Sequence, residues 1–335
     1  ILSFPKIIFL GAISLFVVIG ITAVVKKSSS KSTVAVAKPK VQSMQAQTPR
    51  TPVAPPQPLA SVEQPPAVPV KLDTAAKDDF PVADRIQQLF TTGPAKLPIV
   101  ETVTYSSKVS WLVGRPAWIS DYSTHYATSR HFIARGLNGK ADYFTQTVSS
   151  GKKFNVFRKD KRINFYLLVD LSRCKLGFYY VDLDTHERVL LKTYAIGVGR
   201  LDSKKASGSL TPLGKYSLGS KIAIYKPGTT GLYQEQKIDM ISVFGTRWIP
   251  FDLELEGCTA PSKGYGLHGL PWRQDPATGK YMECRDLLGL HDSDGCIRLA
   301  HEDVEELFAI VVTKPTYVEI VKDYTQAKLP GVEVR

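Results

Sequence analysis

A proline-rich stretch near the N-terminus limits where this chain can build a folded core. Nine prolines lie between Pro39 and Pro69, with Ser, Thr, Ala and Gln among them and no aromatic residue. Such a segment has too few large apolar side chains to bury a core, and proline fixes φ and lacks a backbone N–H. We expect residues 28–81 to form an extended, disordered linker, so the folded domains must follow it.

An uncharged segment precedes this linker. Residues Ile7–Val25 number 19 and contain no charged side chain, and Lys26 and Lys27 follow directly. As a helix they would span about 28 Å at 1.5 Å per residue, close to the apolar thickness of a bilayer. No small-x-small cleavage site follows promptly, so residues 1–27 are predicted to be a transmembrane anchor rather than a cleaved signal. Taken alone, the lysines after the span would keep the rest of the chain in the cytoplasm.

Positive charge is concentrated in the middle of the chain. The formal net charge is +12, and residues 81–165 carry 13 Lys or Arg against 5 Asp or Glu, whereas residues 166–335 carry 21 against 22. A basic segment of this kind suits an anionic partner such as an acidic polymer or an anionic membrane surface. No nucleic-acid-binding motif accompanies it, so a nucleic-acid partner is not expected.

The same middle segment, residues 82–163, is predicted to be a small α+β module. Val100–Tyr105 and Phe154–Phe157 have the composition of strands. Two helix starts lie between them, one after Gly114 and one at Thr128-Ser129. The predicted order is therefore strand, helix, helix, strand.

This order resembles a LysM module over about residues 104–157. The counterparts of its motif positions are Gly114, Asn138 and Gly151. The resemblance implies binding to glycan strands. A purely structural spacer is the alternative interpretation of the same pattern.

From Asn164 onward the pattern becomes that of strands. Alternating or β-branched runs are separated by turn residues, and one helical pattern begins at His301 with apolar positions on one face. We predict a mostly-β domain over residues 164–323, a β-sandwich or barrel-like core with one clear helix, followed by a tail at 324–335. The predicted strands include Phe165–Leu171, Leu176–Leu183, Val189–Val198, Met240–Phe251, Tyr265–His268 and Tyr317–Val321.

One cysteine in this domain has the surroundings of a nucleophile. Cys296 lies in the segment Ser293–Arg298, and His268 lies 28 residues upstream. A cysteine nucleophile needs a base beside it in space, not in sequence, and His268 can take that role. Backbone N–H groups of Gly295 and Cys296 can stabilise an oxyanion. Arg298 can hold a substrate carboxylate as a bidentate pair, or form a structural ion pair.

Four motifs together resemble the L,D-transpeptidase catalytic domain of the YkuD type, over about residues 164–322. They are the strand Leu168–Leu171, the Thr-Pro-x-Gly sequence at Thr211–Gly214, His268-Gly269, and Ser293–Arg298 before the helix. The resemblance implies that Cys296 attacks a peptidoglycan stem tetrapeptide, releases D-alanine and forms a thioester. An acceptor amine then gives a 3→3 cross-link, whereas water gives carboxypeptidase activity.

The resemblance also implies other features of the site and its setting. No cofactor and no metal are required, and the partners are peptidoglycan stem peptides and glycan strands. The catalytic domain then belongs on the outer side of the cytoplasmic membrane, held by a single-pass anchor. Residues expected to contact substrate are Arg298, Ser293, Gly269 and His291.

The chain departs from the family pattern at two places. Asp294 stands where the family has histidine, and 24 residues separate His268 from Ser293, more than is usual. The extra residues, 273–285, have a loop composition and suggest an added lid or substrate loop. A carboxylate beside a thiol disfavours the thiolate, so Asp294 must point away or be matched by a cation, for which His291 and Arg298 are candidates.

Two further functional interpretations stay open. Asp294 is also compatible with an inactive site in a non-enzymatic protein that binds the cell wall. The other interpretation is a cysteine hydrolase that acts on peptides unrelated to the cell wall. Among the remaining cysteines, Cys258 and Cys284 can pair in an oxidising compartment or stay as free thiols. The spacing of Cys284, His291 and Cys296 matches no paired zinc pattern, so no metal is expected.

Overall fold

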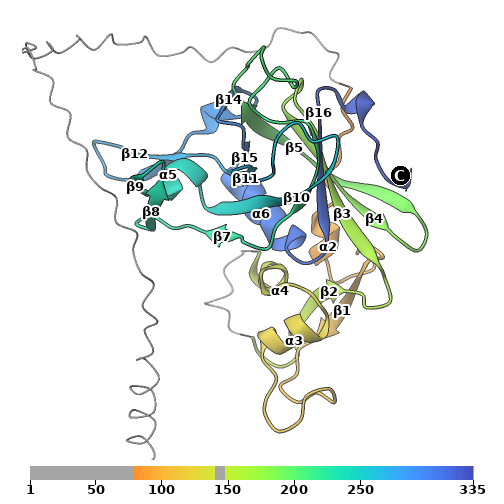
Figure 1. Cartoon of the computed structure of the whole chain (residues 1–335). Helices are drawn as coiled ribbons and strands as arrows, with labels where there is room; N and C mark the ends of the chain where they lie inside the picture. The colour runs from red at the N-terminus through yellow and green to blue at the C-terminus, as the bar shows by residue number, and fades with distance from the viewer. Residues whose placement is uncertain (1–78, 140–147, 335) are drawn as a thin grey trace, which may run out of the picture. The chain divides into compact units, whose positions relative to one another are not determined.

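The computed structural model describes residues 79–139 and 148–334 (Figure 1). These residues belong to one compact unit. The predicted anchor at 1–27 and nearly all of the predicted linker lie outside the described residues and stay predictions. Within the described ranges, no helix has both the length and the apolar character needed to cross a bilayer.

The C-terminal part folds into a closed ring of strands. The hydrogen-bonded order is β11-β15-β5-β4-β3-β16-β6-β10, and β10 pairs with β11 to close it. The prediction of a barrel-like, mostly-β domain is therefore confirmed. The ring consists of β3 (Ile163–Asp170), β4 (Lys175–Asp182), β5 (Glu187–Gly199), β6 (Gly214–Leu218), β10 (Arg247–Glu256), β11 (Gly266–Gly269), β15 (Ile297–Leu299) and β16 (Thr316–Val321).

The two faces of β3 and β4 explain their nearly continuous apolar sequence. Phe165, Leu167 and Phe178 point into the main core, whereas Tyr166 and Tyr179 point to the other face. That second face is covered as well, by Phe80 and by residues near the C-terminus. Strands that are buried on both sides lack a polar face, and so they read as unbroken apolar runs.

Helix α6 (His301–Val311) is the one long helix of this domain and packs against the ring. Its positions Val304, Leu307, Phe308 and Val311 are all buried, as the 3.6-residue periodicity predicts. The helix follows β15 after a single residue, Ala300. The same short stretch of chain therefore carries both the predicted nucleophile and the main helix.

The stretch predicted as one strand, Met240–Phe251, is two elements instead. A short helix α5 (Ile241–Phe244) comes first, and β10 begins only at Arg247. Gly245 separates them with φ +59, and a Cβ there would lie 2.7 Å from the Gly269 backbone. The tight approach to β11 leaves no room for a Cβ, and the positive φ of Gly245 ends the regular element.

Two hairpins extend from the same side of the ring (Figure 1). The first consists of β8 (Thr230–Tyr233) and β9 (Gln236–Asp239). The second, within the predicted loop 273–285 and its flanks, consists of β12 (Trp272–Gln274) and β13 (Tyr281–Glu283). The remaining short elements are β7 (Ala223–Ile224), η1 (Arg285–Leu287), β14 (His291–Ser293), η2 (Tyr324–Gln326) and β17 (Val332–Glu333).

The middle module has the predicted order of elements. Its antiparallel strands β1 (Val100–Thr104) and β2 (Lys153–Phe157) enclose helices α3 (Ile119–His125) and α4 (Arg130–Asn138). A short helix α2 (Gln87–Phe90) precedes them. The Ser129 hydroxyl caps α4 by accepting a hydrogen bond from the Phe132 N–H at 3.1 Å.

The module shares its core with the ring. Leu89, Phe132 and Phe157 belong to the same apolar cluster as Phe165 and Phe308. Polar contacts join α4 to α6 as well: Arg135 pairs with Glu306 at 2.9 Å, and the Ser129 hydroxyl donates to the Ala309 carbonyl at 3.0 Å. The module is thus packed directly onto the helix that follows the predicted nucleophile.

Candidate active site

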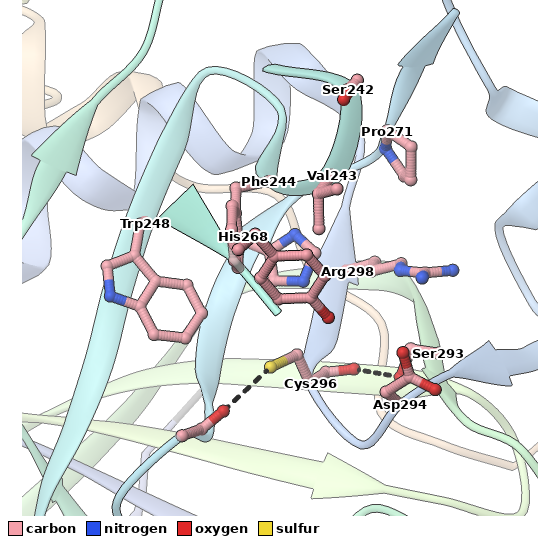
Figure 2. Close-up of a pocket in the computed structure, with 12 residues that line it drawn as sticks. Ser242, Val243, Phe244, Trp248, His268, Pro271, Ser293, Asp294, Cys296 and Arg298 are labelled. Atoms are coloured by element: carbon pink, nitrogen blue, oxygen red, sulfur yellow. Dashed lines mark hydrogen bonds between the residues drawn. The ribbon is translucent and has the colours of Figure 1, made fainter. Parts of the chain in front are cut away.

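A pocket of about 400 Å³ lies where β11 and β15 run side by side (Figure 2). It brings together four of the residues predicted from sequence: Cys296, His268, Ser293 and Arg298. Asp294 lines it too. The other lining residues are Tyr233, Ser242, Val243, Phe244, Trp248, Gly264 and Pro271.

The strand register explains why the histidine and the cysteine meet. Strands β11 and β15 are parallel, and His268 is paired with Arg298. Side chains alternate between faces along a strand, so Cys296 and Arg298, two residues apart, point the same way. Paired residues on neighbouring strands also share a face. The three functional groups therefore converge on one side of the sheet.

The backbone turn before Cys296 is held by three hydroxyl hydrogen bonds. The Ser293 hydroxyl donates to the Cys296 carbonyl at 2.6 Å and accepts from the Gly295 N–H at 3.1 Å. The buried Thr211 hydroxyl donates to the Gly295 carbonyl at 3.0 Å. It also accepts from the Gly199 N–H at 2.8 Å. This gives the Thr-Pro-x-Gly sequence a physical role, because its threonine clamps the nucleophile turn to β5.

Gly295 is required by the shape of this turn. Its φ is +118, and a Cβ there would lie 2.6 Å from the Tyr265 ring and 2.8 Å from the Leu210 carbonyl oxygen. No other residue fits without displacing backbone. The Gly295 N–H was also expected to stabilise an oxyanion, but it already donates to the Ser293 hydroxyl. Of the two expected donors, the Cys296 N–H is the one that stays available for the oxyanion.

His268 is buried and held in one tautomer. Its Nδ1 lies 2.7 Å from the Gly269 carbonyl oxygen. Since a carbonyl can only accept, Nδ1 carries the proton and Nε2 is the free acceptor. Burial, with a smaller contribution from the Arg298 charge, lowers the pKa of His268 to about 3. The imidazole is therefore neutral at pH 7, the form that can accept a proton. Gly269 acts here through its carbonyl and does not line the pocket.

Aromatic rings surround His268. The Phe244 ring lies 5.3 Å from the imidazole at 73°, and the Trp248 ring lies 5.9 Å away at 38°. Tyr233 packs edge-on against Phe244 at 5.3 Å. These rings exclude water from the base and fix its orientation. Phe244 and Trp248 are close in sequence, but the sequence pattern did not predict that they contact His268. Residues 240–251 were predicted as one strand, so the helix that ends at Phe244 was not expected.

Cys296 is partly exposed, and its thiol is protonated at neutral pH. The sulfur lies 3.6 Å from the Gly264 carbonyl oxygen, to which the thiol donates (Figure 2). Burial raises the pKa of Cys296 to about 11; a hydrogen bond from the Gly266 backbone and the Arg298 charge oppose that rise, whereas Asp294 adds to it. The resting pair is therefore neutral thiol and neutral imidazole rather than an ion pair.

Asp294 is matched by a cation that the sequence did not suggest. Arg200 Nη2 lies 2.5 Å from Asp294 Oδ1, and both side chains are about half exposed (55% each). Arg298 instead pairs with Asp292 at 2.9 Å. His291 donates from Nδ1 to the Gly199 carbonyl at 3.1 Å and does not line the pocket. Neither predicted candidate is the partner of Asp294.

The two hairpins are joined beside the pocket. The Tyr281 hydroxyl on β13 donates to Asp239 Oδ2 at the end of β9, at 2.6 Å. The β8–β9 hairpin supplies Tyr233 to the pocket, and α5 supplies Phe244. Burial raises the pKa of Tyr233, so its hydroxyl stays protonated and can donate. The extra chain length at 273–285 thus supports a pocket wall.

The other cysteines do not form a disulfide. Cys258 and Cys284 are free thiols. The Cys258 thiol donates to the Lys215 carbonyl at 3.1 Å, whereas Cys284 packs with Leu270 and Leu287. Across residues 79–139 and 148–334, no three His, Cys, Asp or Glu side chains are grouped to hold a metal ion.

Comparison with known proteins gives one family match, which covers the part of the chain that carries the site. Residues 164–320 match the model of the YkuD family, the L,D-transpeptidase catalytic domain. No curated protein matches the chain. Similar solved structures include Bd1075 of Bdellovibrio bacteriovorus, with 17% identity, a TM-score of 0.32 and 48% of each chain covered. Another is the helical cell shape determining protein Pgp2 of Campylobacter jejuni, with 18% identity, a TM-score of 0.31, and 52% of this chain and 51% of that chain covered. The chain thus spans about half the length of these solved proteins.

Proposed function

We propose that this chain is a cysteine-dependent L,D-transpeptidase that acts on peptidoglycan stem peptides, and the match of residues 164–320 to the YkuD family model supports this. The observation that carries the proposal is the convergence of the Cys296 thiol and a neutral His268 on one pocket. The base and a nearby arginine lie on paired strands of the ring, and the nucleophile directly precedes the second of these strands. The LysM-like interpretation of the middle module is not needed for it.

The chemistry follows from the protonation states. His268 Nε2 takes the thiol proton while the Cys296 sulfur attacks the carbonyl carbon of the third stem residue, forming a C–S bond. The oxyanion is stabilised by the Cys296 N–H, a donor of the kind worth roughly 3 kcal/mol. The imidazolium then protonates the leaving amine of D-alanine as the C–N bond breaks, which leaves a thioester. An acceptor amine gives up a proton to His268, attacks the thioester and restores the thiol.

Arg298 is suited to hold a carboxylate of the donor. It lines the pocket beside Cys296 and is already partly matched by Asp292. A guanidinium presents a planar fork that can bind a second carboxylate. We therefore assign it to substrate binding, and Ser293 to holding the turn rather than to direct contact.

The experiment uses a carbapenem as an acylating probe. Intact mass of the purified chain is expected to show one adduct, absent from Cys296→Ala and retained in Cys258→Ala. Incubation with a stem tetrapeptide is expected to release D-alanine. A cross-linked dimer identifies an amine acceptor, and a free tripeptide identifies water. A wild-type chain that gives neither adduct nor D-alanine refutes the enzymatic proposal.

A second candidate is a wall-binding protein with an inactive site, which the carboxylate of Asp294 beside Cys296 in the pocket favours. The middle module would carry that binding, and its basic excess and the exposed Trp118, at 63%, support contact with glycan strands. Pull-down of the whole chain with purified glycan strands is expected to weaken in Trp118→Ala. Equal retention of both variants would exclude this surface.

The location of the protein is also part of the proposal. Substrate of this kind lies outside the cytoplasmic membrane, and the uncharged run at 7–25 is long enough to anchor the chain there. Protease added to spheroplasts is expected to degrade residues 79–334. Protection of these residues would place them in the cytoplasm and contradict the proposal.

A further inference from the structure

The ion pair between Arg200 and Asp294 lies at the edge of the pocket. Asp294 lines the pocket two residues before the nucleophile, whereas Arg200 follows β5 directly. Their charged atoms are 2.5 Å apart, and each side chain is about half exposed. An exposed ion pair typically adds little to folding stability, because solvent screens it. We therefore expect the pair to act on the reactivity of the adjacent Cys296 thiol rather than on folding stability.

The fold places these two residues together by its backbone. Strand β14 runs parallel to β5, with Ser293 paired to Gly199, so the next residues on each strand are neighbours. The Arg200 N–H donates to the Ser293 carbonyl at 2.9 Å, and the Arg200 carbonyl accepts from the Leu210 N–H at 2.8 Å. The backbone of Arg200 is therefore held through both its N–H and its carbonyl, which sets the starting point of its side chain beside Asp294.

The charges that face the thiol show what Arg200 adds. His268 on β11 is neutral, and Tyr233 on β8 keeps its proton. Arg298 on β15 is already matched by Asp292. Asp294 is the acidic group of the nucleophile turn itself, and only Arg200 is bonded to it among the described residues. Without Arg200, an unmatched carboxylate would stand beside the sulfur and disfavour the thiolate.

We propose that Arg200 is a positioning residue for the nucleophile: it holds the Asp294 carboxylate and offsets its charge, so that Cys296 can pass its proton to His268. This inference rests on the proposed role of Cys296 as nucleophile. It explains how the domain can keep a carboxylate at this position and still react. Arg200 and Asp294 then form one functional unit, and removing both does less harm than removing the arginine alone.

A double-mutant cycle tests this unit on the thiol itself. The rate of alkylation of Cys296 by iodoacetamide, which forms an S–C bond and releases iodide, is measured from pH 6.5 to 9.5 on the purified chain. Arg200→Gln is expected to slow it about three- to ten-fold at each pH, as a thiol pKa higher by about 0.5–1 unit requires. Asp294→Asn in the same chain is expected to restore the rate, and Arg200→Lys to retain most of it.

Arg162→Gln is the matched control, because Arg162 also forms an exposed ion pair, with Asp184, away from the pocket. It is expected to leave the rate unchanged. An unaltered rate in Arg200→Gln overturns the proposal, and so does a slow rate that Asp294→Asn fails to restore. Peptide mapping assigns the label to Cys296. The alkylation rate depends on the Cys296 thiol and not on turnover of substrate. If the variants show the expected alkylation rates but the wild type releases no D-alanine, the enzymatic function is refuted, whereas the role of Arg200 is not.

Discussion

At the scale of single residues, His268 links the site to the acid stability of the fold. Its folded-state pKa of about 3 lies well below the ordinary value of 6.5. Between these two values the unfolded chain binds a proton that the folded chain does not. Stability from this group is thus present above pH 6.5 and is lost as the pH falls toward 3, at up to about 1.4 kcal/mol per pH unit.

Replacing His268 should make the unfolding free energy depend less strongly on pH in the acid range. Urea unfolding of the wild type and His268→Asn is compared at pH 7, 5.5 and 4.5. We expect the difference in unfolding free energy between the two proteins to shrink as the pH falls, because only the wild type gains a proton on unfolding. Parallel curves would mean that the folded protein already binds this proton.

Gly295 offers a second prediction at this scale. Gly295→Ala combines a positive φ with a clash against Tyr265 and Leu210, so we expect it to cost more than about 2 kcal/mol. Gly289→Ala is the control, since its φ is +76 but nothing lies within 4 Å of the added Cβ. It should cost about 1 kcal/mol. Equal losses of unfolding free energy in the two variants, measured with denaturant, would show that Tyr265 and Leu210 move away from the added Cβ at little cost.

The nucleophile, its base and the adjacent arginine were predictable because short motifs carry them. Ser293 to Arg298 form one turn and strand, and the two hydrogen bonds of the Ser293 hydroxyl are local. Arg200 was not predictable, since only the pairing of β14 with β5 brings it to Asp294. His291 was predicted to contact substrate, but its side chain turns toward Gly199 instead.

At the scale of elements, the two hairpins beside the pocket act together through Tyr281 and Asp239. Tyr281→Phe removes the hydroxyl of this contact and keeps the ring. We expect faster amide hydrogen exchange in residues 230–244 and in β12–β13, because the hairpins lose their link. Strands β3 and β4 serve as the internal control and should exchange as before. Unchanged exchange in the hairpins would show that packing alone holds them.

The helices and strands also show which parts of the fold can be predicted from a sequence pattern. The strands β3, β4 and β16 were predicted within two residues, because burial on the sheet dictates their residue types. Residues 240–251 were not, since the break at Gly245 is caused by its contact with Gly269, which is distant in sequence. The hairpin at 272–283 was predicted as a loop, because its strands are three residues long and largely exposed.

At the scale of the whole molecule, residues 79–139 and the ring share one core, so we expect them to unfold together. Phe132 is fully buried between the module and the ring. Phe132→Ala should cost about 3–5 kcal/mol and lower a single thermal transition. The exposed Trp118 provides the control, and Trp118→Ala should change stability by no more than about 0.5 kcal/mol. Two separate transitions would show that the module is an independent domain.

The register that joins His268 to Arg298 also bears on how such a chain can change in length during evolution. A one-residue insertion within β11 or β15 would turn every following side chain to the opposite face and separate the base from the thiol. Insertions between the two strands have no such effect, and parallel strands need a long connection in any case. The β12–β13 hairpin lies within that connection. This region can therefore gain or lose residues and reshape the pocket wall while the chemistry beneath it is preserved.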